Sequence, residues 1–399
     1  MRRITNPILA IVLVLSAGRI VDAACNGTPL MGLHGDGTFN DGPAIQVALD
    51  AARPFAPYLG RGSVVLAPGR YRVEAPLNIK AGVVLCGSTQ GPFDVVGINP
   101  GGTSGTPLAA TLLIPNTPLN HGQNALPFIT LEGQGAGITD ILFHYPDQVA
   151  PVFAPPGSQG SPPDDLYPFT IKMANASQKV ERCTVTNAYR FLLITSGRTL
   201  ARDLNIGAFY VGIYIDGPAD HVAITGTTHS VFWDIYASVP VWQSQLSKWT
   251  ANNGYGFIIY RADYVVIENT LVVWRYAAFH IGWSPSAQAA PFSSWGTATD
   301  LMCDLCRYGI IANSTEPHGW EFANIHIVPN PPASNDPPGF GGVSAVAYLE
   351  PPAGKGQPRV VLNGGSIRND QLGGWEDKYQ EFTGPGSKLL VVNILDEQQ

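Results

Sequence analysis

A short sequence pattern recurs along the middle of this chain. Each copy has an alternating run of apolar residues, a small polar turn and a second short apolar run, at a spacing of about 20 residues where no insertion intervenes. The copies are VERCTVTNAYRFLLIT (180–195), ARDLNIGAFYVGIYID (201–216), DHVAITGTTHSVFWDI (220–235), DYVVIENTLVVWRYAAFHIG (263–282) and ATDLMCDLCRYGIIAN (298–313). A single copy cannot bury its own apolar face, so we expect the copies to stack as parallel strands around one continuous core.

The open end of such a stack needs a cover, because its strand edge and apolar core are exposed. One helical pattern precedes the first coil, over 43–52, with Asp41 as a plausible N-cap and Pro43 in its first turn. Its apolar residues that can cover the end of the stack are Ile45, Val47, Ala48 and Leu49. The sequence therefore predicts a parallel β-helix with an N-terminal capping helix.

The segment HGDGTFNDGPAIQVALDAA (34–52), followed by GSVVLAPGRYRV (62–73), resembles the opening of the pectate lyase superfamily. The matching residues are Gly35, Asp36, Gly37, Asp41, Ala44, Ile45, Gln46, Ala48, Ala51, Ala52, Pro68, Gly69 and Tyr71. The resemblance implies an all-β fold, a single-stranded right-handed parallel β-helix, and the coil pattern extends it to about residue 370. It does not select one chemistry, because hydrolases, lyases, epimerases and phage tailspikes share this opening.

We divide the chain into four segments. Residues 1–23 are expected to be a signal peptide, because Arg2 and Arg3 precede an apolar stretch, Ile8–Ala17, that is too short for a membrane span of about 20 residues. Residues 24–60 hold the N-terminal segment and capping helix, 61–373 the β-helix and 374–399 a C-terminal cover. The expected location is secreted or periplasmic, and lipoprotein anchoring at Cys25 is the less favoured alternative.

Charge and cysteine content narrow the possible partners. The net charge is −7 and only 13% of residues are charged, which excludes a basic nucleic-acid footprint. The five cysteines leave one over if pairs oxidise. Cys303 and Cys306 are expected to be residues of a strand and its turn rather than a local disulfide, and no further ligands complete a zinc site. The expected partner is a polysaccharide, and the oligomeric state is open.

Strand alternation predicts which residues face outward. Alternate positions in GIYID, SVFWD, GFIIY and AFHIG suit the core, which leaves the polar residues between them on one outer groove walled by the 233–254 insertion. The predicted catalytic residues are Asp216, Asp234 and His280. The predicted substrate-binding residues are Tyr214, Tyr260, Arg261, Trp242, Trp249, Trp274 and Trp283, because sugar rings stack on aromatic side chains.

Two carboxylates on adjacent coils suit glycoside hydrolysis, in which one donates a proton and the other activates water or attacks carbon. A neighbouring histidine can keep the acid protonated or relay protons. The order Asp216, Asp234, His280 is similar to that of the polygalacturonase family. The chain lacks that family's N-T-D, D-D, G-H-G and R-I-K strings, so its residue roles are not carried over.

Two alternatives remain. A lyase acting on a uronate polymer needs a base and a group that neutralises the carboxylate, for which Arg261, Asp263, Glu268 and Arg275 are candidates. No cofactor is expected for a hydrolase, whereas a lyase often uses Ca²⁺ held by carboxylates. The third reading is a non-catalytic sugar-binding solenoid, in which Glu316, His318 and Glu321 are further candidates for contact with a glycan.

Overall fold

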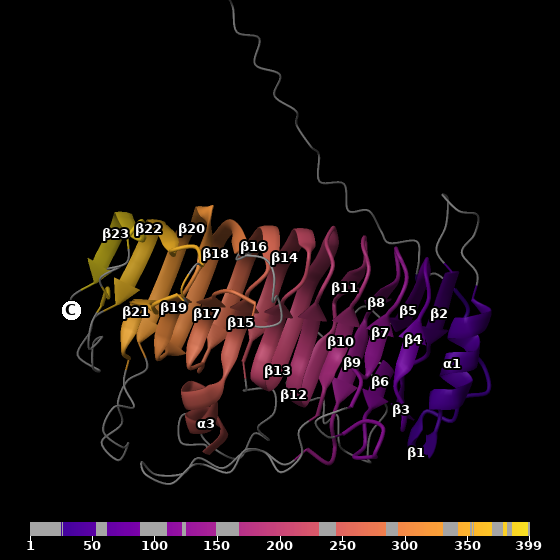
Figure 1. The fold of residues 1–399 in the computed structure, drawn as a ribbon. Helices are drawn as coiled ribbons and strands as arrows, with labels where there is room; N and C mark the ends of the chain where they lie inside the picture. The colour runs from indigo at the N-terminus through magenta and orange to yellow at the C-terminus, as the bar shows by residue number, and fades with distance from the viewer. Residues whose placement is uncertain are drawn as a thin grey trace, which may run out of the picture.

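The protein is a long parallel β-helix, shown as a ribbon in Figure 1. The computed structural model describes residues 25, 27–52, 62–87, 110–121, 125–148, 167–230, 245–284, 294–329, 342–351, 353, 355–368, 378–380 and 385–397. Within these residues, 23 strands form one wound sheet, and the strands pair in parallel. The predicted fold class, an all-β right-handed parallel β-helix, is confirmed.

The N-terminal half is built from short strands. Its elements are β1 (Asp36–Asn40), α1 (Gly42–Ala51), β2 (Gly62–Leu66), β3 (Gly69–Arg72), β4 (Leu77–Ile79), β5 (Val83–Gly87), β6 (Ala110–Leu113), β7 (Ile129–Leu131), β8 (Gly137–Thr139), β9 (Ile141–His144), β10 (Phe169–Met173) and β11 (Lys179–Glu181).

The C-terminal half has longer strands that bend around the coil. Its elements are β12 (Thr184–Ile194), β13 (Thr199–Ile215), β14 (Ala219–His229), α3 (Gln245–Asn253), β15 (Tyr255–Ile259), β16 (Ala262–Val273), β17 (Ala277–Ile281), β18 (Ser294–Cys306), β19 (Tyr308–Ala312), β20 (Thr315–Pro329), β21 (Ser344–Tyr348), β22 (Arg359–Arg368) and β23 (Lys388–Glu397).

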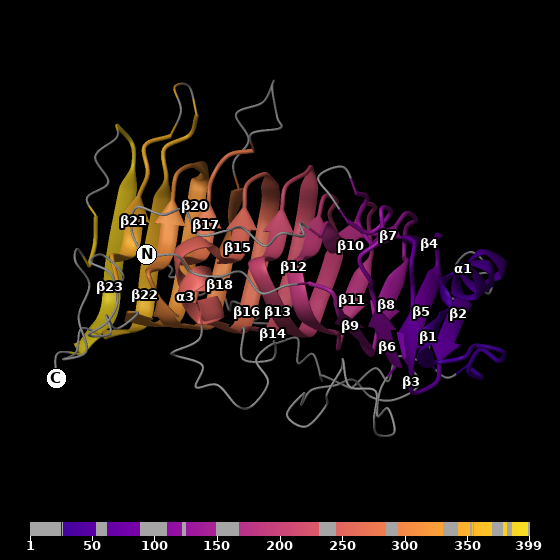
Figure 2. The ribbon, with the colours of Figure 1, turned by 90° about the horizontal axis from the view of Figure 1, so that it is seen from below.

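Each coil contributes to three faces of the helix. One face, here called the groove face, consists of β4, β7, β10, residues 190–194 of β12, residues 211–215 of β13, β15, β17, β19 and β21. In Figure 1 these strands lie together along the lower front of the ribbon. Figure 2 shows the same stack from below, with α3 leading into β15.

Inward-facing residues stack from coil to coil to form the core. Phe257 and Phe279 are fully buried with ring centroids 4.9 Å apart and planes at 3°. The predicted inward positions all have 0% exposure; they are Ile213, Ile215, Phe257, Ile259, Phe279 and Ile281. Strand alternation therefore placed the core of the groove face correctly, and the residues between these positions point outward or into the gaps between coils.

The predicted small polar turn is a left-handed corner between the other two faces. One residue per coil has a positive φ there, from 48° to 78°; these residues are Asp140, Arg182, Asp203, Gly226, Asn269, Asp300, Asn324, Gly364 and Asn393. Glycine, asparagine and aspartate tolerate this region best, and they occupy all but one of the positions. A single such residue turns the chain sharply, so strands continue on both sides of the corner.

The coil therefore has three strands, where the repeat had suggested two. The segment after Asp220 pairs with residues 199–206 of β13 through Val222 and His229, and β14 ends at His229. It does not lie beside the strand that ends at Ile215, whose neighbours on the groove face are β12 and β15. The described strand that precedes Asp234 therefore stacks on a different face from the strand that precedes Asp216, and the position of Asp234 beside Asp216 stays a prediction. Asp234 itself lies outside the described residues.

The superfamily motif builds the N-terminal end of the stack. Asp41 takes the N-cap position of α1, but its carboxylate accepts the backbone N–H groups of His34 and Gly35, at 2.9 and 3.0 Å, instead of capping the helix. In α1, Ile45 and Leu49 are fully buried, whereas Val47 is 68% exposed and is not part of the cover. Asp41, Ile45 and Leu49 therefore have structural roles at this end of the stack.

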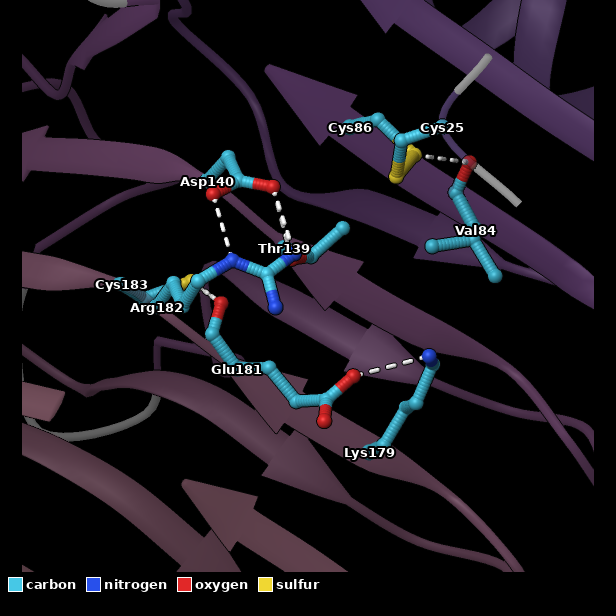
Figure 3. Close-up of a disulfide and its surroundings, with 9 residues drawn as sticks. All are labelled: Cys25, Val84, Cys86, Thr139, Asp140, Lys179, Glu181, Arg182 and Cys183. Carbon is cyan, nitrogen blue, oxygen red and sulfur yellow. Dashed lines mark hydrogen bonds and ion pairs between the residues drawn. A yellow bond between two sulfur atoms is a disulfide. The ribbon is translucent and has the colours of Figure 1, made fainter. Parts of the chain in front are cut away.

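The described cysteines comprise one disulfide and three buried thiols. Cys25 is bonded to Cys86, as Figure 3 shows, so its sulfur is not free to carry the thioether of a lipoprotein. Cys183, Cys303 and Cys306 are free and buried, and the last two belong to β18, as expected for strand residues. Residues 1–24 lie outside the described part, so the signal peptide remains a prediction.

Buried ion pairs lie on the same face of the stack as Cys86, because Cys86 pairs in register with Thr139, which pairs with Glu181. Figure 3 shows the Arg182 guanidinium against the Asp140 carboxylate, with an N–O distance of 2.8 Å, and Lys179 against Glu181 at the same distance. Glu181 is 1% exposed. The Arg182–Asp140 pair joins neighbouring coils, whereas Lys179 and Glu181 lie on one strand, β11. Both pairs satisfy charges that the coil buries, which gives them a structural role.

The parallel stack continues past residue 373, because β23 pairs with β22 along its length. In the residues that the structure describes, neither helix has the length and apolar character needed to cross a bilayer.

Candidate functional site

The groove face carries a cavity of about 530 Å³, here called the groove cavity. It spans four neighbouring strands of that face, β10, β12, β13 and β15. Its lining residues are Phe169, Arg190, Leu193, Thr195, Tyr210, Val211, Tyr214, Asp216, Ile258 and Tyr260. The cavity therefore combines aromatic rings, one cation and one carboxylate on strands that the coil holds in fixed register.

Asp216 is the one carboxylate among these lining residues. Its backbone N–H donates to the carbonyl of Ile194 at 3.1 Å, which holds the residue at the end of β13. The Tyr214 hydroxyl donates to Asp216 Oδ2 at 3.3 Å. The backbone of Tyr260 bonds to Ile215 in the next coil, which places Tyr260 beside Asp216. Asp216 is thus fixed by the coil, flanked by tyrosines and still partly exposed.

Burial keeps the tyrosines of this site protonated. It raises the pKa of Tyr214, and the nearby Asp216 carboxylate raises it further. Burial also raises the pKa of Tyr260, to about 12. Both hydroxyls are therefore neutral hydrogen-bond donors near neutral pH, and neither is an anionic base.

A ladder of aromatic rings follows the groove face beyond the cavity. The ring centroids of Tyr189 and Tyr210 are 5.2 Å apart with planes at 11°. Further contacts at 5.1 to 6.0 Å connect Tyr210 to Tyr255, Tyr255 to Tyr276, and Tyr276 to Tyr308. Such rings present apolar faces to sugars and keep a polar edge. The ladder runs along the helix axis, as an extended chain of sugar units would.

Arg190 lies at one end of the groove cavity above the rings. Its guanidinium carbon is 5.1 Å from the ring centroid of Tyr189 and 5.5 Å from that of Tyr210. Contact with ring faces is favourable for a guanidinium, and it leaves the N–H groups along the edge of the guanidinium able to bind planar acceptors. Arg190 therefore places a positive charge within reach of a ligand in the cavity.

His280 faces outward as predicted but does not adjoin Asp216. It pairs in register with Ile258, which pairs with Tyr214, so about two strand spacings, roughly 10 Å, separate it from the β13 row. Its ring lies 5.5 Å from Tyr260 and 5.7 Å from Tyr255. Burial lowers the pKa of His280 to about 4. It is a neutral imidazole at neutral pH and carries no charge that could act on the protonation of Asp216.

The predicted tryptophans that the structure describes do not gather in the groove. Trp249, in α3, is 5% exposed and packs in the main core. Trp274 is also 5% exposed, at a left-handed turn after β16. Both assignments to substrate binding are wrong, because each ring fills space inside the fold. Trp283 is partly exposed and lies 4.9 Å from the Lys355 ammonium. Trp242 lies outside the described residues.

The charged residues named for a lyase do not form one site. Arg261 and Asp263 line a different cavity, on the other side of the turn after Asp216. Glu268 is exposed, next to the left-handed corner residue Asn269, and Arg275 is fully buried. These four candidates therefore do not meet at one site, because they lie on different faces of the coil.

Sequence reasoning missed several residues of the site, chiefly Arg190, Tyr210 and the other ladder tyrosines. A signal for them exists: a tyrosine comes just before the apolar run of each groove-face strand, in NAYRF, AFYVG, NGYGF, WRYAA and CRYGI. The repeat of that one residue type marks the outer row of the face. The segments to which strand alternation is applied above begin after these tyrosines, so the prediction did not include them.

Calcium chemistry would need several oxygen ligands at one place. In the described residues, no three His, Cys, Asp or Glu side chains come together as a metal site, and the groove cavity offers Asp216 alone. The described part of the groove cavity therefore does not fit a Ca²⁺ ion held by carboxylates.

Comparison with known proteins gives the fold. No family model matches the sequence, and no match is found among curated proteins. The structure is similar to the polygalacturonase from Erwinia carotovora ssp. carotovora, with a TM-score of 0.54 and 12% identity over 91% of this chain and 92% of that chain. It is also similar to the catalytic unit of the thermostable GH87 alpha-1,3-glucanase from Streptomyces thermodiastaticus strain HF3-3, with a TM-score of 0.51 and 13% identity over 94% of this chain and 70% of that chain.

Both similar structures are those of polysaccharide-degrading enzymes. At 12–13% identity the likeness establishes the shared right-handed β-helix fold, which is the fold that the resemblance to the pectate lyase superfamily implies.

Proposed function

We propose that the protein is a polysaccharide-acting enzyme, and that it is a glycoside hydrolase with Asp216 as one of its two catalytic carboxylates. The observation that supports this most is the position of Asp216. It is the one carboxylate lining the described groove cavity, at the side of a ladder of tyrosine rings. A glycan lying on that ladder would pass a carboxylate that is fixed in place and open to solvent.

The chemistry assigns a role to each neighbour. Asp216 protonates the glycosidic oxygen or activates the attacking water, and the second carboxylate takes the complementary role. We propose Asp234 as that second carboxylate, on the segment between β14 and α3. Tyr214 donates its hydrogen bond to Asp216 and orients the carboxylate. His280, which is neutral, serves as a hydrogen-bonding group on the next strands.

The disulfide supports an exported protein. A bond between Cys25 and Cys86 is stable in oxidising compartments and rare in the cytosol. Together with the signal sequence predicted for 1–23, it supports a secreted or periplasmic location with a polysaccharide as partner.

Substitution of the carboxylates tests the proposal. Asp216→Asn keeps the shape and removes the acid–base function, so turnover should fall by about 100-fold or more while thermal unfolding stays unchanged. Asp234→Asn should do the same. The matched control is Asp203→Asn, at the left-handed corner, where asparagine fits equally well and activity should persist. Full activity of the Asp216→Asn protein on a glycan that the wild type cleaves would overturn the assignment.

A lyase is the second candidate, because of Arg190. Its guanidinium lies in the groove cavity with the protonated tyrosines and can pair with the carboxylate of a uronate unit. The two reactions differ in their products. Hydrolysis gives new reducing ends alone, whereas elimination also gives an unsaturated uronate that absorbs in the ultraviolet. Binding to a glycan panel without any product would instead favour a non-catalytic sugar-binding solenoid.

A further inference from the structure

A second cavity lies on the far side of the turn that ends the groove. It has a volume of about 480 Å³ and is here called the side cavity. Asp216 and Tyr260 line the groove cavity, whereas the residues that follow them, Gly217 and Arg261, line the side cavity. The turn is closed by a hydrogen bond from the Gly217 N–H to the Arg261 carbonyl, 3.1 Å long. The two cavities are therefore separate spaces on two faces of one coil corner.

The side cavity is bordered by an aromatic run of its own. The ring centroids are 5.0 Å apart between His221 and Tyr264, 4.7 Å between Tyr264 and Trp295, and 5.2 Å between Trp295 and His318. These residues lie on four successive strands, β14, β16, β18 and β20. Trp295 and His318 line the cavity itself, and neither is buried.

The Trp295 ring is held in place by its polar edge. Its indole N–H donates to the carboxylate of Asp263, and its ring packs between Tyr264 and His318. A ring so fixed loses little freedom when a ligand covers it, so stacking there is efficient. Trp295 is partly exposed and lines the cavity, so the part of its ring that borders the cavity can receive a flat apolar surface, as one side of a sugar ring presents.

The charges of the side cavity differ from those of the groove cavity. Asp220, Asp263 and Glu316 line it together with the one arginine, Arg261. Carboxylates outnumber the cation, so an acidic sugar would be repelled. Vicinal hydroxyl groups and ammonium groups, in contrast, are donors that carboxylates accept well.

A metal ion does not account for this arrangement. In the part of the chain that the structure describes, no three His, Cys, Asp or Glu side chains lie close enough together to hold one. A purely structural role does not account for the aromatic run either, because the run lies on the outside of the coil, where His221 is 66% exposed.

We propose that the side cavity is a second carbohydrate-binding site, which takes a non-acidic sugar unit, a neutral hexose or a hexosamine, stacked on Trp295. Carboxylates of Asp220 and Glu316 accept its hydroxyl or ammonium donors. The site lies one turn away from the groove and holds a branch or a neighbouring strand of the polymer. It stands on its own residues and does not depend on which reaction the groove performs.

Calorimetric titration of the Asp216→Asn protein tests the site. The probes are tetrasaccharides of β-1,4-linked glucose, of glucosamine and of galacturonate. Trp295→Ala should weaken binding of the first two by about tenfold, the equivalent of about 1.4 kcal/mol. Trp295→Phe keeps a ring and should retain most of the affinity. Glu316→Gln should weaken glucosamine binding more than glucose binding, because it removes a charge at constant size.

The result for galacturonate completes the test. Its binding should not depend on Trp295 or Glu316. Unchanged affinity for the glucose and glucosamine probes in Trp295→Ala, an absence of binding of both probes, or an equal dependence of galacturonate on Trp295 would each overturn the proposal. Turnover by the wild-type protein is measured separately, so a failure of the side cavity and a failure of the hydrolase proposal are distinguishable.

Discussion

The groove cavity and the side cavity are built from the same coils but carry different charges. Asp216 and Tyr260 face the groove, and Gly217 and Arg261, one residue further along, face the side. The groove pairs one carboxylate with one guanidinium, whereas the side cavity has three carboxylates and one guanidinium. The comparison shows that in a β-helix a shift of one residue along the turn changes which ligand a face can receive.

The aromatic rings differ between the two regions in a similar way. Tyrosines dominate the groove, and two of them, Tyr214 and Tyr260, have pKa values raised by burial and supply donors beside Asp216. The side cavity has a tryptophan between a tyrosine and a histidine. Among the described hydrogen bonds, none joins a carboxylate of the side cavity to a tyrosine hydroxyl, as the bond from Tyr214 to Asp216 does in the groove. We therefore expect chemistry in the groove and binding alone at the side.

The shared turn gives the largest expected effect. A Cβ atom at Gly217 would lie 2.3 Å from the Thr195 carbonyl oxygen and 2.8 Å from its Cα, which are backbone atoms that cannot rotate away. Thr195 lines the groove and Gly217 lines the side cavity, so Gly217→Ala should disturb both. We expect a loss of about 1–3 kcal/mol in the free energy of unfolding, measured in urea, together with weaker ligand binding at both cavities.

Gly27→Ala is the matched control for that substitution. Its Cβ would meet only the side-chain ends of Ser63 and Val65, at 3.1 Å, which can move. It should cost less stability and leave both cavities intact. If Gly217→Ala impaired only one cavity, the turn would not be the common support that the comparison assumes.

The fold could be predicted from the sequence because stacked coils repeat a short pattern of buried residues. Inward positions such as Phe257 and Phe279 must be apolar in every coil, so alternation alone identified them, together with the outward Tyr214, Asp216 and Tyr260. The opening motif was also informative, because Asp41 binds the backbone of the preceding turn and its spacing is fixed by that contact.

The site was only partly predictable, because the sequence does not show where the chain turns from one face of the coil to the next. A left-handed corner consumes a single residue, such as Asp203 or Asn269, and leaves no obvious break in the apolar pattern. Two strands on different faces therefore look like one strand in the sequence. The tryptophans were misplaced because a large ring is equally suited to core and surface, and Trp249 and Trp274 are buried.

The next prediction concerns how the free energy of unfolding depends on pH. It compares a histidine of the groove face, His280, with one on another face of the coil, His144. Burial lowers the pKa of His280 and of His144 to about 4, below the ordinary value of 6.5. Between these values the unfolded chain binds protons that the folded chain does not, so stability should fall as pH decreases from 7 to 5. Each histidine should contribute about 1–2 kcal/mol to that loss in urea unfolding.

His280→Gln and His144→Gln distinguish the two positions. Either substitution should make stability less dependent on pH in this range, because the substituted residue no longer gains a proton on unfolding. Only His280→Gln should also alter turnover, since His144 lies on β9 and bonds to Thr186 at 2.8 Å, away from the groove cavity. Equal effects of both on turnover would contradict a role for His280 at the groove.

The smallest expected effect concerns a single ring of the ladder. Tyr210 lines the groove cavity, stacks on Tyr189 at 5.2 Å and lies 5.5 Å from the Arg190 guanidinium carbon. Tyr210→Ala should raise KM by about tenfold, which corresponds to about 1.4 kcal/mol of lost stacking. The value of kcat should change little, because we assign Tyr210 to binding through its ring and not to the chemistry at Asp216. Tyr210→Phe keeps the ring and should bind nearly as well as the wild type. Neither variant should change the affinity of the side cavity for its glucose tetrasaccharide, measured by calorimetry. If Tyr210→Ala weakened both sites equally, the two cavities would act as one continuous binding surface, and the distinction between them would have to be abandoned.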